Sequence, residues 1–145
     1  MYLFNMLKKK EQALAYLTLQ YSANLENHLN FKDICDSLRL VMHEQDIFPK
    51  AGVRVKAYSV EFYSIADGHV NNGFIDMVLR MGAGRSSEKK EKTGKLLMSA
   101  LESKVEKLLK TGFLALALEI VEINSDMSWK INPIHKRLSE NKKLR

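Results

Sequence analysis

The chain of 145 residues has one cysteine and two prolines, and it has no long hydrophobic run. A single cysteine cannot form an internal disulfide. Cys35 falls on the apolar side of an expected helix, so we expect it to be a small buried hydrophobic side chain in a reducing cytoplasm. No apolar run approaches the roughly 20 residues that a membrane-spanning helix needs. The four histidines are scattered and lack the spacing of a ligand pair, so we expect no metal site. Lysines follow the short apolar start, residues 1–7, which is the reverse of a secretory signal and predicts a cytoplasmic protein.

The excess of basic residues lies at the two ends of the chain. The formal net charge is +6. Residues 1–14 hold three lysines and one glutamate, and residues 136–145 hold five basic residues and one glutamate. Residues 15–135 are therefore neutral overall and lack the general basic excess of a nucleic-acid-binding domain. With 46% hydrophobic and 28% charged residues, we expect one soluble globular domain that does not bind nucleic acid.

Hydrophobic periodicity predicts four strands and two helices. We expect strands over residues 15–22, 53–65, 74–81 and 114–123, and helices over residues 31–45 and 87–110. Residues 66–69 form the turn between the second strand and its return strand. The last strand is almost wholly apolar, as a strand covered on both faces is. The order β-α-β-β-α-β predicts an α+β domain, in which a four-stranded mixed sheet carries two helices on one face and each half repeats a strand–helix–strand plan.

The composition also suggests boundaries. We expect residues 1–14 to be an N-terminal extension and the chain to end in a basic C-terminal tail. The segment after the last strand contains Trp129 and Pro133, and we interpret it as a short arm that packs against a neighbour or the body of the domain.

The loop at residues 81–87 is the first candidate site. Gly82 and Gly84 allow a tight turn between the third strand and the second helix, and Ser86 or Ser87 can cap that helix. Arg85 adds a guanidinium whose fork suits a carboxylate, beside backbone N–H groups that attract anions. The loop is either a small anion site or an ordinary strand-to-helix connection with a solvated arginine. It matches neither the Walker A pattern nor the GxGxxG pattern.

Three motifs, in order along the chain, carry a resemblance to a known family. They are Phe-Pro-Lys-Ala-Gly-Val-Arg at residues 48–54, Ala-Asp-Gly at residues 66–68 and Gly-Ala-Gly-Arg-Ser at residues 82–86. Residues 15–138 resemble, without gaps, the 5-carboxymethyl-2-hydroxymuconate Δ-isomerases of the tautomerase superfamily. The resemblance implies that residues 15–138 are the folded domain and that residues 139–145 are the basic C-terminal tail. The resemblance implies a β-α-β-β-α-β subunit in a ring-shaped homotrimer, with sites at subunit boundaries. It also implies an isomerase of aromatic catabolism that moves a double bond of a dicarboxylate by proton transfer, without cofactor or metal.

The same resemblance assigns candidate residues. Arg54 and Arg85 match the family's two catalytic arginines, which bind substrate oxygens and stabilise the developing dienolate charge. Ser86 lies beside Arg85 in the matched motif and is a candidate substrate-binding residue.

The family's general base is an N-terminal proline, and this chain has none at the matching position. That position is Ala15, whose nitrogen is an internal amide, and residues 1–14 leave from the place of the proline and can fill the pocket. Pro49 and Pro133 are both internal, and Met-Pro occurs nowhere. Two readings follow: an isomerase that uses a different base, or a non-catalytic relative that binds a small carboxylate or a protein partner. Chemistry favours the second, because general base catalysis needs a basic atom within hydrogen-bond reach.

Overall fold

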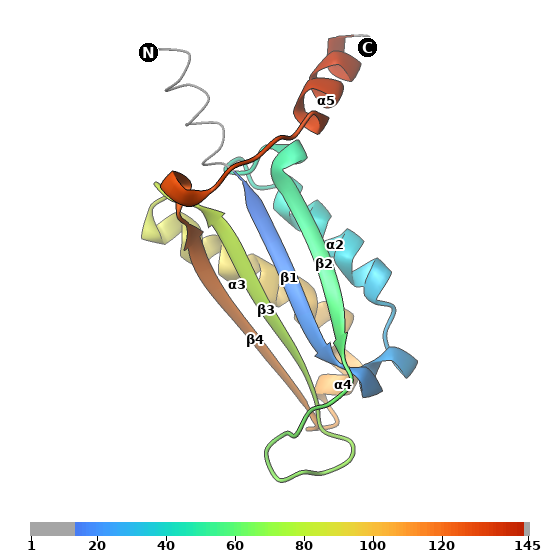
Figure 1. The fold of residues 1–145 in the computed structure, drawn as a ribbon. Helices are drawn as coiled ribbons and strands as arrows, with labels where there is room; N and C mark the ends of the chain where they lie inside the picture. The colour runs from blue at the N-terminus through green and yellow to red at the C-terminus, as the bar shows by residue number, and fades with distance from the viewer. Residues whose placement is uncertain (1–13, 144–145) are drawn as a thin grey trace.

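The computed structural model describes residues 14–143, which form a four-stranded sheet with two long helices on one face (Figure 1). The strands are β1 (Ala15–Ser22), β2 (Val53–Val60), β3 (Gly73–Gly82) and β4 (Leu114–Ile123). The helices are α2 (Phe31–His43), α3 (Ser87–Lys104), α4 (Glu106–Leu109) and α5 (Ile134–Lys143), and the 3-10 turns are η1 (Ala23–Asn27), η2 (Lys50–Gly52) and η3 (Ser125–Met127). The predicted α+β order is therefore confirmed. Within the described residues, no helix combines the length and the hydrophobicity that crossing a membrane requires.

The sheet has the strand order β2-β1-β3-β4. Strand β1 is parallel to β2 and antiparallel to β3, and β3 is parallel to β4. Each half is thus a strand, a helix and a parallel strand, as predicted. The expected return of β2 directly onto β3 is wrong, because β1 lies between them. Strands β1 and β2 are parallel, so a crossover connection must join them, and α2 supplies it. Strand β2 then lies at the edge of the sheet, with β1 between it and β3.

The core lies between the sheet and the two long helices. Alternate residues of β1 and β3 meet in register on the helix side, with Leu17 opposite Leu79 and Leu19 opposite Met77. Ile34, Leu38 and Met42 of α2 and Leu97 and Leu101 of α3 are buried against them. Among the described residues, no helix covers the other face of the sheet (Figure 1), so the residues between these core positions point to a surface that residues 14–143 leave open.

Three elements are shorter than the sequence predicts. Strand β2 ends at Val60 instead of residue 65, because residues 61–72 form a loop held by its own polar groups. In that loop, the Asp67 carboxylate accepts hydrogen bonds from the His69 N–H and the Asn72 side-chain amide. The first helix ends at His43, and the second expected helix divides at Val105, whose backbone is not helical.

Strand β4 does not have the expected cover on both faces. It is an edge strand, and its side chains alternate between half-buried residues on the helix side and exposed residues on the open face. The exposed set is Ala115, Ala117, Glu119 and Val121. An apolar strand at a free edge is a surface that pairs readily with another chain.

Candidate functional site

Ala15 is the first residue of β1 and lies inside the sheet. It pairs with Val53 of β2 on one side and with Met81 of β3 on the other, and its exposure is 0%. The carbonyl of the preceding residue, Leu14, accepts a hydrogen bond of 3.1 Å from the Gly82 N–H. The chain therefore runs through the position of the expected base as ordinary backbone. An amide nitrogen there shares its lone pair with the carbonyl and has no useful basicity.

The side chain of Leu14 fills the space next to this strand end. Leu14 is buried and packs on Gly52, where an added Cβ would lie 3.0 Å from Leu14 Cδ2 and 3.3 Å from Pro49 Cγ. A glycine at residue 52 allows this close approach. Leu14 is thus one residue of the expected extension that packs at the start of β1, and residues 1–13 lie outside the described part of the chain.

The loop between β3 and α3 has the form that its sequence suggests. Gly84 has φ of 102°, a conformation that favours glycine. The Ser86 hydroxyl accepts a 3.2 Å hydrogen bond from the Lys89 N–H and caps α3, so the predicted cap is confirmed at Ser86. Ser86 is exposed, and its hydroxyl keeps a second lone pair and its proton for a ligand.

Arg85 joins this loop to the loop between α2 and β2. Its guanidinium donates hydrogen bonds of 2.7 Å to the carbonyls of Gly82 and Ile47, which are 3 and 38 residues away in sequence. The same group lies over the buried ring of Phe48, 5.2 Å from the centroid. Burial lowers the pKa of Arg85 from its usual value. The arginine is therefore partly a structural clamp, which the sequence reading of a solvated or ligand-binding side chain did not include.

Arg54 lies on the open face of the sheet, at the same end. It is exposed, stands opposite Tyr16 of β1, and places its guanidinium 4.6 Å from the Tyr16 ring centroid. Phe48, under Arg85, belongs to the core beside the helices. The structure thus brings Arg54, Arg85 and Ala15 to one end of the sheet, with the Arg54 guanidinium over Tyr16 on the open face and the Arg85 guanidinium over Phe48 of the core. Tyr16 is a residue that sequence reasoning missed, although its position next to the core residue Leu17 places it on the open face.

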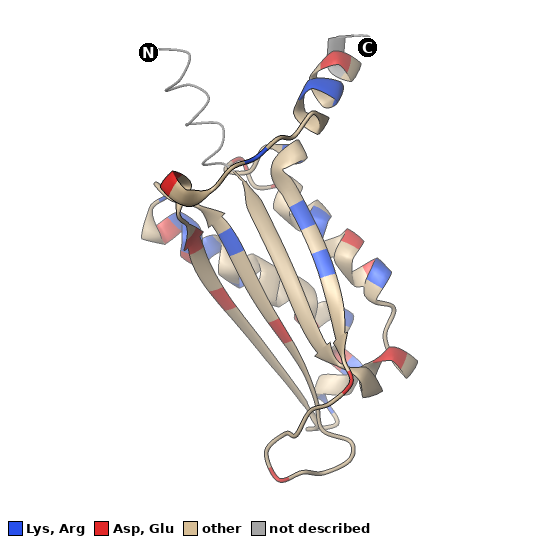
Figure 2. Ribbon diagram, in the orientation of Figure 1, with Lys and Arg blue, Asp and Glu red and all other residues tan. Residues whose placement is uncertain are grey.

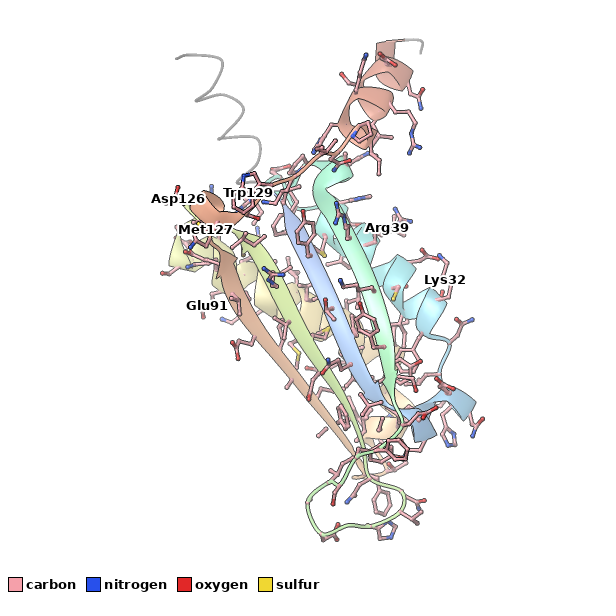
Figure 3. The ribbon with its side chains drawn as sticks, in the orientation of Figure 1. Lys32, Arg39, Glu91, Asp126, Met127 and Trp129 are labelled. Atoms are coloured by element: carbon pink, nitrogen blue, oxygen red, sulfur yellow. The ribbon has the colours of Figure 1, made fainter. Side chains whose placement is uncertain are left out.

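The C-terminal arm runs across this end of the sheet. Figure 3 shows Met127 and Trp129 near the ends of the strands, on the way from β4 to α5. Asn132 fixes the arm by donating a 2.9 Å hydrogen bond to the Ala51 carbonyl. Met127, Trp129 and Ile131 are nevertheless 68%, 82% and 96% exposed. Such a run of large exposed apolar side chains is typical of an interaction surface.

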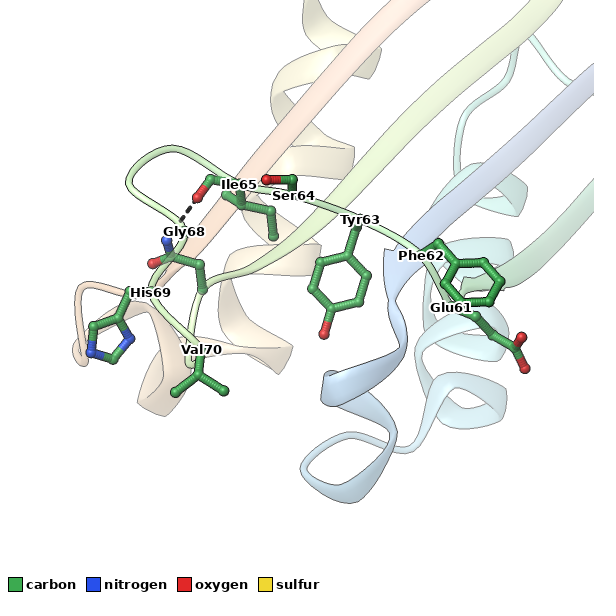
Figure 4. Close-up of a pocket in the computed structure, with 9 residues that line it drawn as sticks. Glu61, Phe62, Tyr63, Ser64, Ile65, Gly68, His69 and Val70 are labelled. Atoms are coloured by element: carbon green, nitrogen blue, oxygen red, sulfur yellow. Dashed lines mark hydrogen bonds between the residues drawn. The ribbon is translucent and has the colours of Figure 1, made fainter.

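The Ala66-Asp67-Gly68 motif lies at the opposite end of the sheet. It belongs to the loop over residues 61–72, which lines an open cavity of about 390 Å³ (Figure 4). Gly68 has φ of 79°, and Asp67 has a lowered pKa because of hydrogen bonds from Asn72 and the His69 backbone. The motif therefore shapes the loop and does not contribute to the arginine end. Over residues 14–143, no three His, Cys, Asp or Glu side chains come together as a metal site.

Comparison with known proteins gives a consistent result. The family model for 5-carboxymethyl-2-hydroxymuconate isomerase matches residues 15–138. The 5-carboxymethyl-2-hydroxymuconate Delta-isomerase of Escherichia coli is 26% identical over 122 residues, which are 84% of this chain and 97% of that protein. A crystal structure of the isomerase from Deinococcus radiodurans R1 has a TM-score of 0.82 at 34% identity and covers 88% of this chain and 96% of the other. The macrophage migration inhibitory factor of Trichinella spiralis shares the fold alone, with a TM-score of 0.55 at 17% identity over 81% of this chain and 96% of that chain.

Proposed function

Because the chain belongs to the 5-carboxymethyl-2-hydroxymuconate isomerase family, we propose that it binds a small unsaturated dicarboxylate and that its proton-transfer step is disabled. We take the ligand class to be an unsaturated dicarboxylate from the breakdown of aromatic rings, met in the cytoplasm. The substrate that names the family is a muconate, itself a dicarboxylate, with a carboxymethyl group that adds a third carboxylate. The observation that carries the proposal is Ala15, a fully buried residue whose nitrogen is part of a peptide bond.

The chemistry of double-bond migration explains why this one residue matters. A base removes the proton of the 2-hydroxyl group, the negative charge spreads over the conjugated dienolate, and a proton returns to a carbon of that system, which moves the double bonds. Arginines stabilise the charge, and they also bind the ground-state carboxylates, so they serve binding with or without turnover. A general base contributes only if a basic atom lies within hydrogen-bond reach of that proton. We propose that Arg54, Arg85 and Ser86 retain the binding part of this site, and that Ala15 removes the base.

We further propose a ring-shaped homotrimer in which the site is shared between subunits. Within one chain, the Arg54 guanidinium lies over Tyr16 on the open face, whereas the Arg85 guanidinium is held on the carbonyls of Gly82 and Ile47. A neighbouring copy can bring its own Arg54 to the Arg85 end. The free edge strand β4 and the exposed arm around Trp129 support this arrangement, because both present apolar side chains without cover in a single chain.

The proposed function predicts binding without efficient turnover. Purified protein is mixed with 5-carboxymethyl-2-hydroxymuconate, whose conjugated system is followed by ultraviolet absorbance, and binding is measured by calorimetry. We expect saturable binding and a rate at least about 10²-fold below that of the E. coli relative, since a general base supplies roughly 10²–10⁴-fold. A rate equal to that of the relative would instead establish the alternative, an isomerase that uses another base. The match of residues 15–138 to an isomerase family is the observation that favours this alternative.

The trimer predicts a molar mass three times the 16.6 kDa of the chain. Light scattering at micromolar concentration measures it directly, and a monomer mass there would contradict the proposal. Trp129→Ser should shift the population toward monomer, because it removes an exposed apolar anchor of the arm. Leu40→Ser is the matched control, since Leu40 is also exposed but belongs to α2 and not to β4 or the arm.

A further inference from the structure

A row of three side chains crosses the open face of the sheet at the arginine end. Tyr16 of β1 is paired with Arg54 of β2 on one side and with Arg80 of β3 on the other. All three alternate with core residues, and both arginines are exposed, so the row faces solvent. The motifs shared with the family do not include Arg80. Only the pairing of β1 with β3 places Arg80 beside Tyr16.

The charges around this row are unbalanced. Lys56 is next to Arg54 on the same face of β2, opposite Thr18. On this face the acids of the neighbouring strands are Asp76 and Glu119, and within the described chain neither forms an ion pair with Arg54 or Arg80. Figure 2 shows the same pattern, with basic positions on the upper parts of β2 and β3 and acidic positions on β4. Cations brought together on one sheet face repel one another, and a bound anion relieves that repulsion.

We propose that Arg54 and Arg80 bind the two carboxylates of a single dicarboxylate, which lies across the Tyr16 ring. Neighbouring strands are about 4.8 Å apart, so the two Cα atoms are separated by roughly 10 Å across β1. The Arg54 guanidinium already leans inward over the Tyr16 ring, which shortens the gap between the two forks. Each fork suits one carboxylate in a bidentate arrangement, and the ring provides a flat apolar support for the carbons between them. Arg80 is then a specificity-determining residue that favours a dianion over a monoanion.

The inference rests on the proposed function for the ligand class, but it requires no turnover. The test compares muconate with sorbate, which has the same diene and only one carboxylate. Calorimetry on the wild-type protein should show tighter binding of muconate. Arg80→Gln should weaken muconate binding by about tenfold or more and leave sorbate binding within about twofold, because charge-assisted pairs are the strong ones. Lys56→Gln is the matched control on the same face, and it should change both ligands by a similar small factor.

The outcomes separate this subsite from the proposed function. If Arg80→Gln changes muconate and sorbate equally, or if the wild-type protein does not prefer muconate, the subsite is wrong. If muconate discrimination depends on Arg80 but the chain isomerises hydroxymuconate at the relative's rate, the subsite stands and the proposal of a disabled step fails. If turnover is absent and discrimination is independent of Arg80, the disabled step stands and the subsite fails.

Discussion

Removal of residues 1–14 with replacement of Ala15 by proline is expected to raise isomerase activity roughly 10²–10⁴-fold over the parent chain. The variant begins with a secondary amine at the first position of β1, where the parent has a buried amide. The deletion also removes Leu14, whose side chain packs on Gly52, and so opens space beside the new amine. Proline is tolerated at the first residue of a strand, so β1 should still form. The activity is measured by the absorbance of the conjugated substrate.

The same truncation with Ala15 retained is the control. It opens the same space and provides a free primary amine, so the difference between the two variants measures the contribution of the proline nitrogen. Both variants lose the hydrogen bond from the Gly82 N–H to the Leu14 carbonyl, and they share that cost. A folded proline variant without any gain would show that the surroundings of β1 no longer suit the reaction. Full activity in the parent would falsify the view that Ala15 disables it.

Arg85→Ala is expected to lower the free energy of unfolding by about 2–6 kcal/mol, since two backbone carbonyls lose a charged donor and each unsatisfied group costs about 1–3 kcal/mol. The carbonyls are those of Gly82 and Ile47, so the loop after α2 would separate from the end of β3. Urea denaturation followed by circular dichroism measures the change. The variant should also bind muconate more weakly, because the loop that contains Ile47 leads directly into β2, and its displacement would move Arg54 at the start of that strand.

Two further variants locate the cause. Arg85→Lys keeps the charge but has no planar fork, so it should recover only part of the stability. Arg39→Ala removes an arginine from the exposed surface of α2, where it makes one loose contact of 3.9 Å with Asp36, and it should change the unfolding free energy by less than about 0.5 kcal/mol. An Arg85→Ala protein as stable as Arg39→Ala would contradict the clamp.

Much of the fold follows from the sequence because its signals are local. Alternation defines β1 and β3, the 3.6-residue period defines α2, and Asn30 and Ser86 sit where their side chains cap α2 and α3. The β-α-β-β-α-β order, and the family through its glycine and arginine motifs, can be read from the printed residues. Ala15 is joined to Leu14 by a peptide bond, and folding cannot turn its nitrogen into the terminal amine that the family resemblance leads one to expect.

The predictions that went wrong concern what covers or adjoins an element. A sequence period shows that a strand has an apolar face, but it does not show which strand lies next to it, so the expected pairing of β2 with β3 missed the position of β1. Strand β4 reads as doubly covered because its exposed face is also apolar, yet in one chain it is an edge. The length of β2 was overestimated because the polar groups of residues 61–72 bond to one another and not along a strand.

The site divides in the same way. The sequence by itself determined that Arg54 and Arg85 are present and that an internal alanine, Ala15, stands where the family resemblance places a terminal proline. Only the tertiary structure decided that Arg85 reaches a carbonyl 38 residues away, that the Arg54 guanidinium lies over the Tyr16 ring, and that Arg80 stands beside Tyr16. The reason is physical: residue identity fixes the available charges and lone pairs, whereas strand order and register fix which of them meet.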